Sequence, residues 1–475
     1  IIDYLCEPLH RTLHDESPYV RKTAVICVAK LFGINQELVD ENGFLDTLQS
    51  MLTDSNPMVL SNVVSALADI HSQAPQLNML LFDERVASKL MGCIGDCSEW
   101  GQVAILDALS EYRPSGAEQI EFSIDSILPR LQHVNPSIVL SAVKVLIVYS
   151  SYLPQGHDYV DLVKRKLAPP IVTLVSSPPE IQYVALRSIR LFLQKYPEIM
   201  HQGIRVFFCK YNDPLYIKTE KLQLILLLAN ESNIDQVYPE LADYAKEVDI
   251  EFVRKAIKCI ADLTCKIPGS ANKSAELLME LAKSDARHVV QEVLIAARNV
   301  ISNFPGSAFV RIIPHLYRDS SFYDEAESRA ALVWLVGELI ELIPDGFEVL
   351  SEILENFKLE SVTVQSELFT AILKLYLKNP DSMRSVICNL IEIAKISIES
   401  AEFRDRAFFY ERLIDLDPRM IRGISLSGAI ADVNLNQVEP RLLEQLLKQL
   451  GSLSSVYYRF PEEFTSPPME EPVAE

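Results

Sequence analysis

An apolar stripe that returns at a regular spacing constrains the fold of this chain more than any other feature of the sequence. In residues 15–32, DESPYVRKTAVICVAKLF, a turn with a proline is followed by apolar side chains at the i, i+4, i+7, i+8 and i+11 positions of one helical face. The stripe runs from Val20 to Leu31 and includes Cys27. It begins again at Val59, Val139, Val253, Val289 and Val364, and it fails only at Ser150. Each stretch is therefore predicted to form one amphipathic helix.

The spacing between these stretches indicates a repeat. Val20 and Val59 are 39 residues apart, Val253 and Val289 are 36, and Val289 and Val364 are 75. These are single or double steps of a unit of about 40 residues, which is the period of HEAT and armadillo helical hairpins. One hairpin cannot bury its stripe alone, so neighbouring hairpins must stack. The predicted fold class is all-α, an α-solenoid of HEAT- or armadillo-like repeats.

Proline-bearing turns mark the predicted helix starts. In the turns at residues 17–18, 56–57, 135–136 and 213–214, a proline follows Ser, Asn or Asp. Proline loses nothing in the first helical turn, and the polar residue before it can cap the helix. The proline pairs at 169–170 and 178–179 are expected to bracket a short helix around residues 171–175, where the regular period is interrupted.

Composition sets the expected domain boundary near the end of the chain. The last helix is expected from Glu439 to about Tyr458. After it, residues 461–475 contain four prolines, five glutamates and no basic residue, a composition that cannot bury enough apolar surface to fold. We therefore predict a solenoid trunk over residues 1–460 and the start of a disordered, acidic, proline-rich hinge over 461–475. Because the sequence begins at Ile1 in helical pattern, we expect the natural N-terminus to be missing.

The charge of the chain argues against a nucleic-acid partner. The formal net charge is −21, whereas phosphate binding needs clustered Lys and Arg. The best basic patch, Lys164-Arg165-Lys166, is interpreted as a solvated helix end. No apolar run approaches the roughly 18 residues that suggest a membrane span. The eight cysteines, Cys27 and Cys259 among them, are interpreted as small apolar side chains in a reducing compartment.

The sequence assigns no catalytic, cofactor-binding or metal-binding residue. It lacks the phosphate-binding loop, the dinucleotide fingerprint and the HExxH motif. Cys93 and Cys97 are one helical turn apart, but without further ligands they are predicted to pack in the core. His288 and His315 are interpreted as turn residues, and Glu325 and Glu327 as a solvated first turn of a helix. The chain is predicted not to be an enzyme and to need no cofactor.

Two further features have a functional and a structural interpretation. Residues 413–417, LIDLD, match the pattern of a clathrin-binding box, which needs an extended, exposed segment. Here they end a predicted helix, so we interpret Leu413 and Leu416 as core residues. Trp100 and Trp334 are interpreted as core anchors, with a partner-facing tryptophan as the alternative.

Several stretches resemble the trunk of a beta-adaptin, the beta-type large subunit of heterotetrameric clathrin adaptor complexes. The resemblance extends from about Ile1 to Phe464 and includes DSNPMVLSNVVSALADI, SEWGQVAILDAL, KYNDPLYIKTEKL, RAALVWLVGELIE and LGSLSSVYYRFPEEF. The chain is similar to both the plasma-membrane and the trans-Golgi beta subunits, and its sequence does not distinguish between these two.

The resemblance implies a scaffold that assembles with a second large subunit, a medium subunit and a small subunit. Its C-terminal half would hold the N-terminal domain of the medium subunit, and a hinge beyond residue 475 would bind clathrin. The implied location is the cytoplasmic side of the trans-Golgi, endosomal or plasma membrane, on clathrin-coated pits and vesicles. The residues that bind partners stay unknown. Two alternatives stay open, a karyopherin-like transport receptor and another HEAT-repeat scaffold such as that of a phosphatase.

Overall fold

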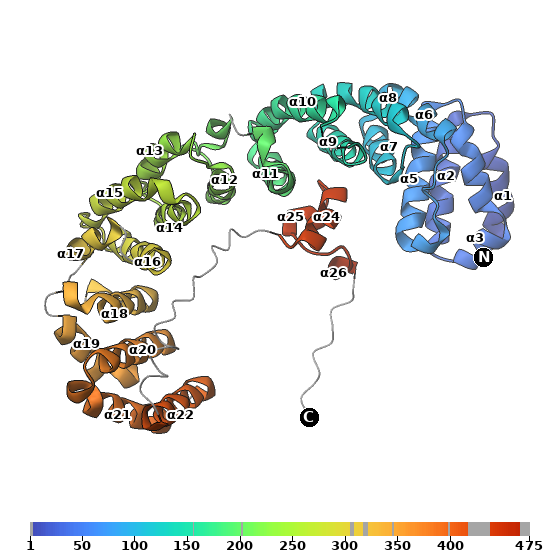
Figure 1. The fold of residues 1–475 in the computed structure, drawn as a ribbon. Helices are drawn as coiled ribbons and strands as arrows, with labels where there is room; N and C mark the ends of the chain where they lie inside the picture. The colour runs from blue at the N-terminus through green and yellow to red at the C-terminus, as the bar shows by residue number, and fades with distance from the viewer. Residues whose placement is uncertain are drawn as a thin grey trace. The chain divides into compact units, whose positions relative to one another are not determined.

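The computed structural model describes residues 3–154, 156–200, 203–304, 308–316, 322–343, 346–397, 400–416 and 438–465. Within these ranges the regular secondary structure is helical, and no residue forms a β-strand. The chain divides into two compact units, and each is a stack of helical hairpins (Figure 1). Unit 1 holds residues 1–206 and 438–475, and unit 2 holds residues 207–437. The predicted α-solenoid fold is confirmed.

Each unit has one row of first helices and one row of second helices, named by their order within the hairpin. The first helices of unit 1 are α1 (Asp3–Leu13), α3 (Gln36–Glu41) with α4 (Phe44–Ser50), α6 (Glu84–Cys93), α8 (Ala117–Ile127) and α10 (Asp158–Val175). Its second helices are α2 (Pro18–Phe32), α5 (Pro57–Gln73), α7 (Glu99–Glu111), α9 (Pro136–Ser150) and α11 (Pro179–Lys195). From α2 to α9, each second helix packs against the next.

Unit 2 repeats this arrangement. Its first helices are α13 (Ile234–Tyr244), α15 (Ala271–Ala282), α17 (Ile313–Leu316), α19 (Gly346–Glu355) and α21 (Pro380–Ser397). Its second helices are α12 (Leu215–Leu228), α14 (Ile250–Lys266), α16 (Arg287–Asn303), α18 (Ala326–Leu339), α20 (Val362–Lys378) and α22 (Ala401–Leu416). From α12 to α20, each second helix packs against the next.

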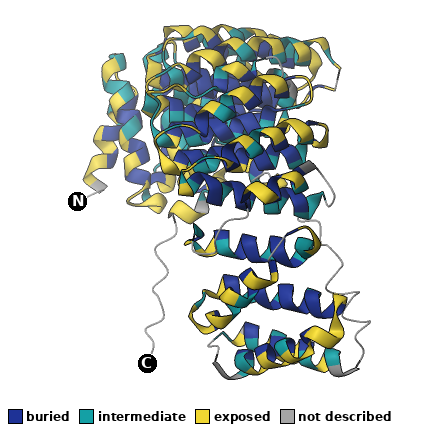
Figure 2. Ribbon diagram, turned by 90° about the vertical axis from the view of Figure 1, so that its left-hand side faces the viewer, coloured by how far each residue is buried: buried dark blue, intermediate teal, exposed yellow. Residues whose placement is uncertain are grey.

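The apolar stripes of the sequence all lie on second helices. The stripes that begin at Val59, Val253, Val289 and Val364 are buried along their whole length. Figure 2 shows this burial on the facing sides of the helices, with exposed residues on their outer sides. One assignment was wrong, because Cys27 on α2 is exposed. It lies at the margin of its stripe, three residues after the buried Ala24.

Asparagine caps explain two of the predicted helix starts. The Asn56 side chain accepts hydrogen bonds from the N–H groups of Met58 (2.9 Å) and Val59 (3.4 Å), and Asn135 accepts one from Ser137 (2.9 Å). The other two caps were wrongly predicted. Ser17 precedes α2 without a side-chain capping bond, and Asp213 lies one residue before the N-cap of α12.

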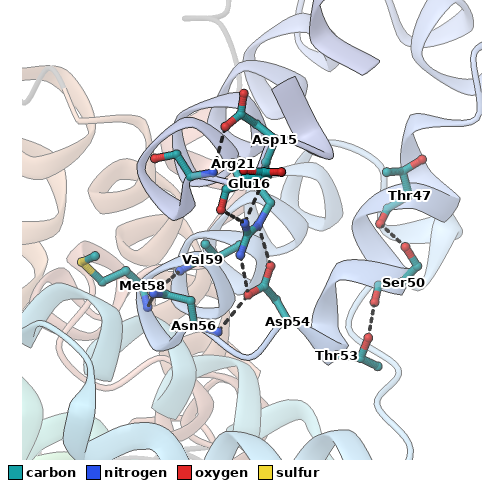
Figure 3. A network of polar contacts seen from close by, with 11 residues as sticks. Asp15, Glu16, Arg21, Thr47, Ser50, Thr53, Asp54, Asn56, Met58 and Val59 are labelled. Atoms are coloured by element: carbon teal, nitrogen blue, oxygen red, sulfur yellow. Dashed lines mark hydrogen bonds and ion pairs between the residues drawn. The ribbon is translucent and has the colours of Figure 1, made fainter. Parts of the chain in front are cut away.

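Ion pairs join the start of one second helix to the loop that leads into the next. Arg21 on α2 donates two hydrogen bonds to Asp54, from Nε at 2.9 Å and from Nη2 at 3.1 Å (Figure 3). Its other nitrogen, Nη1, donates to the carbonyl oxygens of Asp15 and Glu16. Burial alone would raise the pKa of Asp54, but Arg21 and the Asn56 N–H outweigh it and lower that pKa. The pair therefore holds two consecutive repeats in register.

This link recurs along the chain, each time between two residues that are about one repeat apart. It is formed by Lys218 with Glu247 (2.5 Å), Arg287 with Asp324 (3.2 Å) and Arg329 with Glu360 (2.5 Å), and, as a neutral–charged hydrogen bond, by Asn135 with Glu99 (2.7 Å). Each contact fixes a loop against a neighbouring helix, so the edge of the stack is more rigid than its loop sequences suggest.

The proline pair at 169–170 does not interrupt a helix. α10 runs continuously from Asp158 to Val175 through both prolines, so the predicted short helix at residues 171–175 was wrong. Lys164, Arg165 and Lys166 therefore lie in the middle of α10, not at a helix end. Packing of Val163, Leu167 and Ile171 in the core of unit 1 offsets the two backbone hydrogen bonds that the prolines remove.

The predicted last helix is also divided. Residues 439–458 form α24 (Pro440–Lys448) and α25 (Leu453–Tyr457), separated by Gly451 at φ 83°. Glycine tolerates this left-handed conformation, and Ser452 caps the second helix by accepting a hydrogen bond from the Ser455 N–H (3.4 Å). A short helix, α26 (Glu462–Thr465), follows. The predicted hinge is thus helical at its start in the described residues, and residues 466–475 lie outside them.

Two glycines allow second helices to approach each other closely. A Cβ at Gly337 on α18 would lie 2.6 Å from the Cβ and 2.9 Å from the Cα of Ala371 on α20. A Cβ at Gly101 on α7 would lie 2.8 Å from the Cβ of Ser61 on α5. Since real Cβ atoms do not approach that closely, a side chain at either position forces the helices apart.

Replacing Gly337 by alanine is expected to destabilise unit 2 by about 1 to 3 kcal/mol, because the helices must separate to admit the methyl group. Gly92→Ala is the matched control: Gly92 also lies in a helix, and its Cβ would meet nothing within 4 Å. There alanine should stabilise by about 0.5 to 1 kcal/mol through helix propensity alone. Thermal unfolding followed by circular dichroism measures both, and equal shifts in the two variants would contradict the packing argument.

The first hairpin of unit 2 contains a buried ion pair. The Lys221 side chain is 1% exposed, and its Nζ lies 2.5 Å from Oδ2 of Asp213, which also accepts the Lys210 N–H (2.8 Å). An ammonium group in this position needs its partner, because an unpaired buried charge is costly.

Asp213→Ala is expected to lower the stability of unit 2 by about 3 to 5 kcal/mol, since it leaves the Lys221 ammonium buried and unpaired. Asp235→Ala removes a pair of similar length, Lys273–Asp235 (2.5 Å), whose side chains are exposed. That control should change stability by at most about 1 kcal/mol. Hydrogen exchange at α12, combined with thermal unfolding, measures the stability loss in the two variants. Similar losses in both variants would refute a special role for burial.

Candidate protein-interaction surface

The solvent-facing side of the second helices in unit 2 carries the most organised polar cluster in the described part of the chain. We name it the Trp334 face and define it by Glu292 and Arg298 on α16, Trp334 and Glu338 on α18, and Glu367 and Lys374 on α20. The buried stripes of the same three helices point toward the core of the stack. The face therefore uses side chains that the fold leaves available.

Trp334 lies between two cations. The Arg298 guanidinium carbon is 6.0 Å and the Lys374 Nζ 5.7 Å from its ring. Each cation is also paired with a carboxylate, Arg298 with Glu367 (2.7 Å) and Lys374 with Glu338 (2.6 Å). The Arg298–Glu367 pair joins α16 to α20 across the intervening α18. These contacts hold the half-buried indole in one position, as a binding anchor requires.

A second cluster lies on the α14, α16 and α18 side of the same face. Arg254 on α14 pairs with Glu325, the residue that precedes α18, again across one intervening helix. Glu292 on α16 lies close to this pair. Burial raises the pKa of Glu292 to about 7; Arg254 and Lys258 oppose the shift, and Glu327 and Glu325 add to it. The carboxyl of Glu292 is therefore partly protonated near neutral pH.

In unit 1, part of the corresponding side is covered by the chain itself. Residues 438–465, here called the return segment, pack on the second helices α9 and α11 (Figure 1). Leu443, Leu446, Leu447 and Leu450 of this segment are buried. Gln194 on α11 clamps the main chain of Val438, donating to its carbonyl oxygen (2.9 Å) and accepting from its N–H (3.1 Å).

The other end of the return segment is held by arginines of α11. The guanidinium of Arg187 stacks on the Tyr458 ring at 3.5 Å, and Arg190 lies 5.5 Å from the same ring. Arg187 Nε donates to the Val456 carbonyl oxygen (2.7 Å), and Tyr458 Oη donates to the Arg187 carbonyl oxygen (3.0 Å). The structure thus contains one example of how a second-helix row binds a short helical segment.

The two tryptophans are not core anchors as predicted. Trp100 at the start of α7 is 86% exposed, and Trp334 is half-buried on the Trp334 face. Both lie on the side of their helix that points away from the apolar stripe, because Gly101 and Ile105 on α7, and Val333 and Val336 on α18, already fill the buried side. The partner-facing alternative of the sequence analysis stays a prediction for both.

The cysteines and histidines that the sequence analysis considered do not form a site. Cys97 is buried as predicted, and its Sγ donates to the carbonyl oxygens of Pro57 (3.5 Å) and Cys93 (3.4 Å). His288 lies in the first turn of α16 and His315 in α17, so neither is a turn residue as predicted. Across the described ranges, no three His, Cys, Asp or Glu side chains gather as a metal site would require.

The remaining predicted residues fall partly inside the described chain. Glu327 is an exposed first-turn residue of α18, as predicted, whereas Glu325 is committed to the ion pair with Arg254. The LIDLD motif lies at the end of α22 through Leu416, and Asp417 lies outside the described residues. The predicted burial of Leu413 and Leu416 concerns side chains that are also outside them.

Sequence reasoning missed the ion pairs that join α16 to α20 and α14 to the start of α18. Their partners are 69 and 71 residues apart, which is close to two repeat lengths. Opposite charges separated by about two repeat lengths in the sequence were the signal that could have found them. No sequence signal was available for the docking of the return segment, because its contacts join residues that are 244 to 271 positions apart and follow no period.

The stacked hairpins, with one row of first helices and one row of second helices in each unit, define the class of protein as an α-solenoid. A comparison with known families then gives the family. The family model described as "Adaptin N terminal region" matches residues 1–418, and the chain belongs to this family. Together with the relatives described next, which are beta subunits, this match confirms the resemblance to beta-adaptins.

The curated relatives are beta subunits of adaptor complexes. The chain is 42% identical over 465 residues to AP-1 complex subunit beta-1 of Homo sapiens, covering 98% of this chain and 49% of the relative. It is 40% identical to AP-1 complex subunit beta of Dictyostelium discoideum, with coverages of 98% and 49%. It is 34% identical to AP-2 complex subunit beta of Schizosaccharomyces pombe, with coverages of 96% and 68%.

The chain thus spans about half the length of the AP-1 relatives. Among the helices that the structure describes, none combines the length and the apolar character needed to cross a membrane.

Glu292 is expected to make stability depend on pH. Its raised pKa means that, between about pH 4.5 and 7, the folded state keeps a proton that the unfolded state has lost, so stability falls as pH rises through this range. Glu292→Gln fixes the neutral form and should stabilise by about 1 to 3 kcal/mol above pH 7, with little effect near pH 5. Thermal unfolding at several pH values measures this. The control is Glu276→Gln at an exposed carboxylate of α15, and a difference independent of pH would contradict the assignment.

Proposed function

We propose that this chain is the structural scaffold subunit of a clathrin-associated adaptor complex. It would assemble with a second large, a medium and a small subunit for cargo selection and coated-vesicle formation. The observation that carries this proposal is the 42% identity to an AP-1 beta-1 subunit over 98% of the chain. Its work would be binding and not catalysis, consistent with the adaptor subunits that are its relatives.

The Trp334 face is the part of unit 2 that we assign to subunit binding. Binding energy at protein interfaces is concentrated in a few anchors, among which Trp and Arg are enriched. Here a tryptophan is held by Arg298 and Lys374, whose own carboxylate partners limit their motion. Such pre-organisation lowers the entropy lost on binding. In unit 1 the second helices α9 and α11 are in contact with the return segment, and this assignment concerns unit 2 alone.

Clathrin and the membrane are the outer partners in this proposal. Clathrin binding would come from a hinge that follows the trunk, and the acidic, proline-rich residues 461–475 are proposed to begin that hinge. Attachment to trans-Golgi, endosomal or plasma membranes would be peripheral and made through the assembled complex.

The test is co-expression of the full chain with second large, medium and small adaptor subunits of the trans-Golgi or the plasma-membrane type. A stoichiometric complex through size exclusion is the expected result, and the partner set that assembles identifies the coat. A chain that stays alone with both sets, yet binds a nucleotide-loaded small GTPase directly, would replace this proposal by the transport-receptor alternative.

Trp334→Ala is expected to weaken binding of the partner subunits at least tenfold, because truncation of an interface anchor costs about 2 kcal/mol or more. Tyr19→Ala, which removes an exposed aromatic side chain from α2 in unit 1, is the matched control and should assemble normally. Circular dichroism verifies that both variants are folded. Wild-type assembly of a folded Trp334→Ala variant would move the subunit interface away from this face without affecting the family assignment.

A further inference from the structure

A second surface, separate from the Trp334 face, lies at the edge of unit 1 where α7 and α9 begin. Trp100 is the second residue of α7 and is 86% exposed, and Val134, two residues before α9, is 95% exposed. Their chain neighbours are joined by the hydrogen bond from Asn135 Nδ2 to Glu99 Oε2 (2.7 Å). The two residues therefore belong to consecutive repeats that this bond joins.

The fold does not need a tryptophan at this position. The buried side of α7 is formed by Ile105, Leu106 and Leu109, and Gly101 makes the close approach to Ser61. The equivalent second positions are Ser137 on α9 and Glu180 on α11, whereas α2 carries the exposed Tyr19 there. At 86% exposure the Trp100 side chain contributes little to the core, so it is available for binding.

The backbone that carries Trp100 is firmly held. Ser98 caps α7 by accepting a hydrogen bond from the Gly101 N–H (3.2 Å), and Gln102 Nε2 donates to the Cys97 carbonyl oxygen (3.1 Å). Cys97 itself is buried and donates to the carbonyl oxygen of Pro57 in the preceding repeat. The exposed indole thus projects from a fixed position, which reduces the entropy lost when a partner binds.

The charge around Trp100 determines the chemistry of that partner. Two exposed carboxylates, Asp96 and Glu99, precede it in the chain. Among the described residues, none of the cation–π contacts involves Trp100, in contrast to Trp334, which has two. An exposed indole with two exposed carboxylates near it in the chain suits a lysine or arginine, because the ring attracts the cation and a carboxylate accepts its hydrogen bonds.

We propose that Trp100, Val134, Asp96 and Glu99 form a binding site for a basic segment of a partner protein. The cation of a partner lysine or arginine lies on the Trp100 indole, near the two carboxylates. An adjacent aliphatic side chain of the partner packs on Val134. The proposal stands on these residues of unit 1 and does not depend on the assignment of the Trp334 face.

The test uses the fluorescence of Trp100 in the full chain, with Trp334→Phe making it the only tryptophan. The probes are a short peptide in which leucine alternates with lysine and arginine, and a matched peptide with glutamate and aspartate in place of the basic residues. The basic peptide is expected to quench and blue-shift the emission saturably, and the acidic peptide to leave it unchanged. Losing the cation–π contact with Trp100 is expected to weaken the affinity for the basic peptide about two- to fivefold.

Variants separate this site from nonspecific attraction to an acidic chain. Asp96→Asn combined with Glu99→Gln should weaken the basic peptide severalfold at low salt, whereas Tyr19→Ala, at another exposed second-position aromatic, should not change it. Equal binding of both peptides, no saturable change, or an unaffected charge variant would overturn the proposal. A blue shift that depends on protein concentration alone would also overturn it, because it indicates binding of a second copy of the chain. A blue shift produced only by anionic phosphatidylserine vesicles would overturn it too, because it indicates membrane binding.

Discussion

The burial of one apolar stripe on each helix is the constraint on which the rest of this structure depends. A helix such as α14 or α16 is apolar along one side only, and a single hairpin leaves part of that side in water. Stacking removes it from water by placing each second helix against the next, as α14 lies against α16. The close approaches at Gly101 and Gly337 follow from the same requirement, because the stripes interlock only where small residues permit.

Polar contacts act on this stack in two ways. At its edge, pairs such as Arg21–Asp54 and Arg329–Glu360 fix the loops and hold successive repeats in register. On the solvent side of unit 2, pairs that cross an intervening helix organise the surroundings of Trp334. The first group supports the fold directly. The second group adds little stability where it is exposed, and its greater effect is to pre-organise a surface.

The two units use the same kind of surface differently. In unit 1, the row of second helices binds the chain's own return segment through buried leucines, a main-chain clamp by Gln194 and the stacking of Arg187 on Tyr458. In unit 2, the Trp334 face carries an aromatic anchor with two cations. A repeat architecture thus presents similar rows of helices whose exposed side chains differ from one unit to the other.

Local sequence patterns were enough to predict the all-α repeat fold and the second helices, because a stripe with a period of 3.6 residues that returns about every 40 residues is a local pattern. The family came from the resemblance of longer stretches to beta-adaptins. Local patterns also determined the Asn56 and Asn135 caps, which depend only on adjacent residues. Tertiary structure decided the rest: that α10 continues through two prolines, that both tryptophans face away from the core, and where residues 438–465 dock. These outcomes depend on contacts between residues far apart in the chain, whose energies no local pattern encodes. The apolar stripe of each helix specifies which side chains must be buried. The polar side of the helix has no regular pattern, so it does not specify what the helix binds.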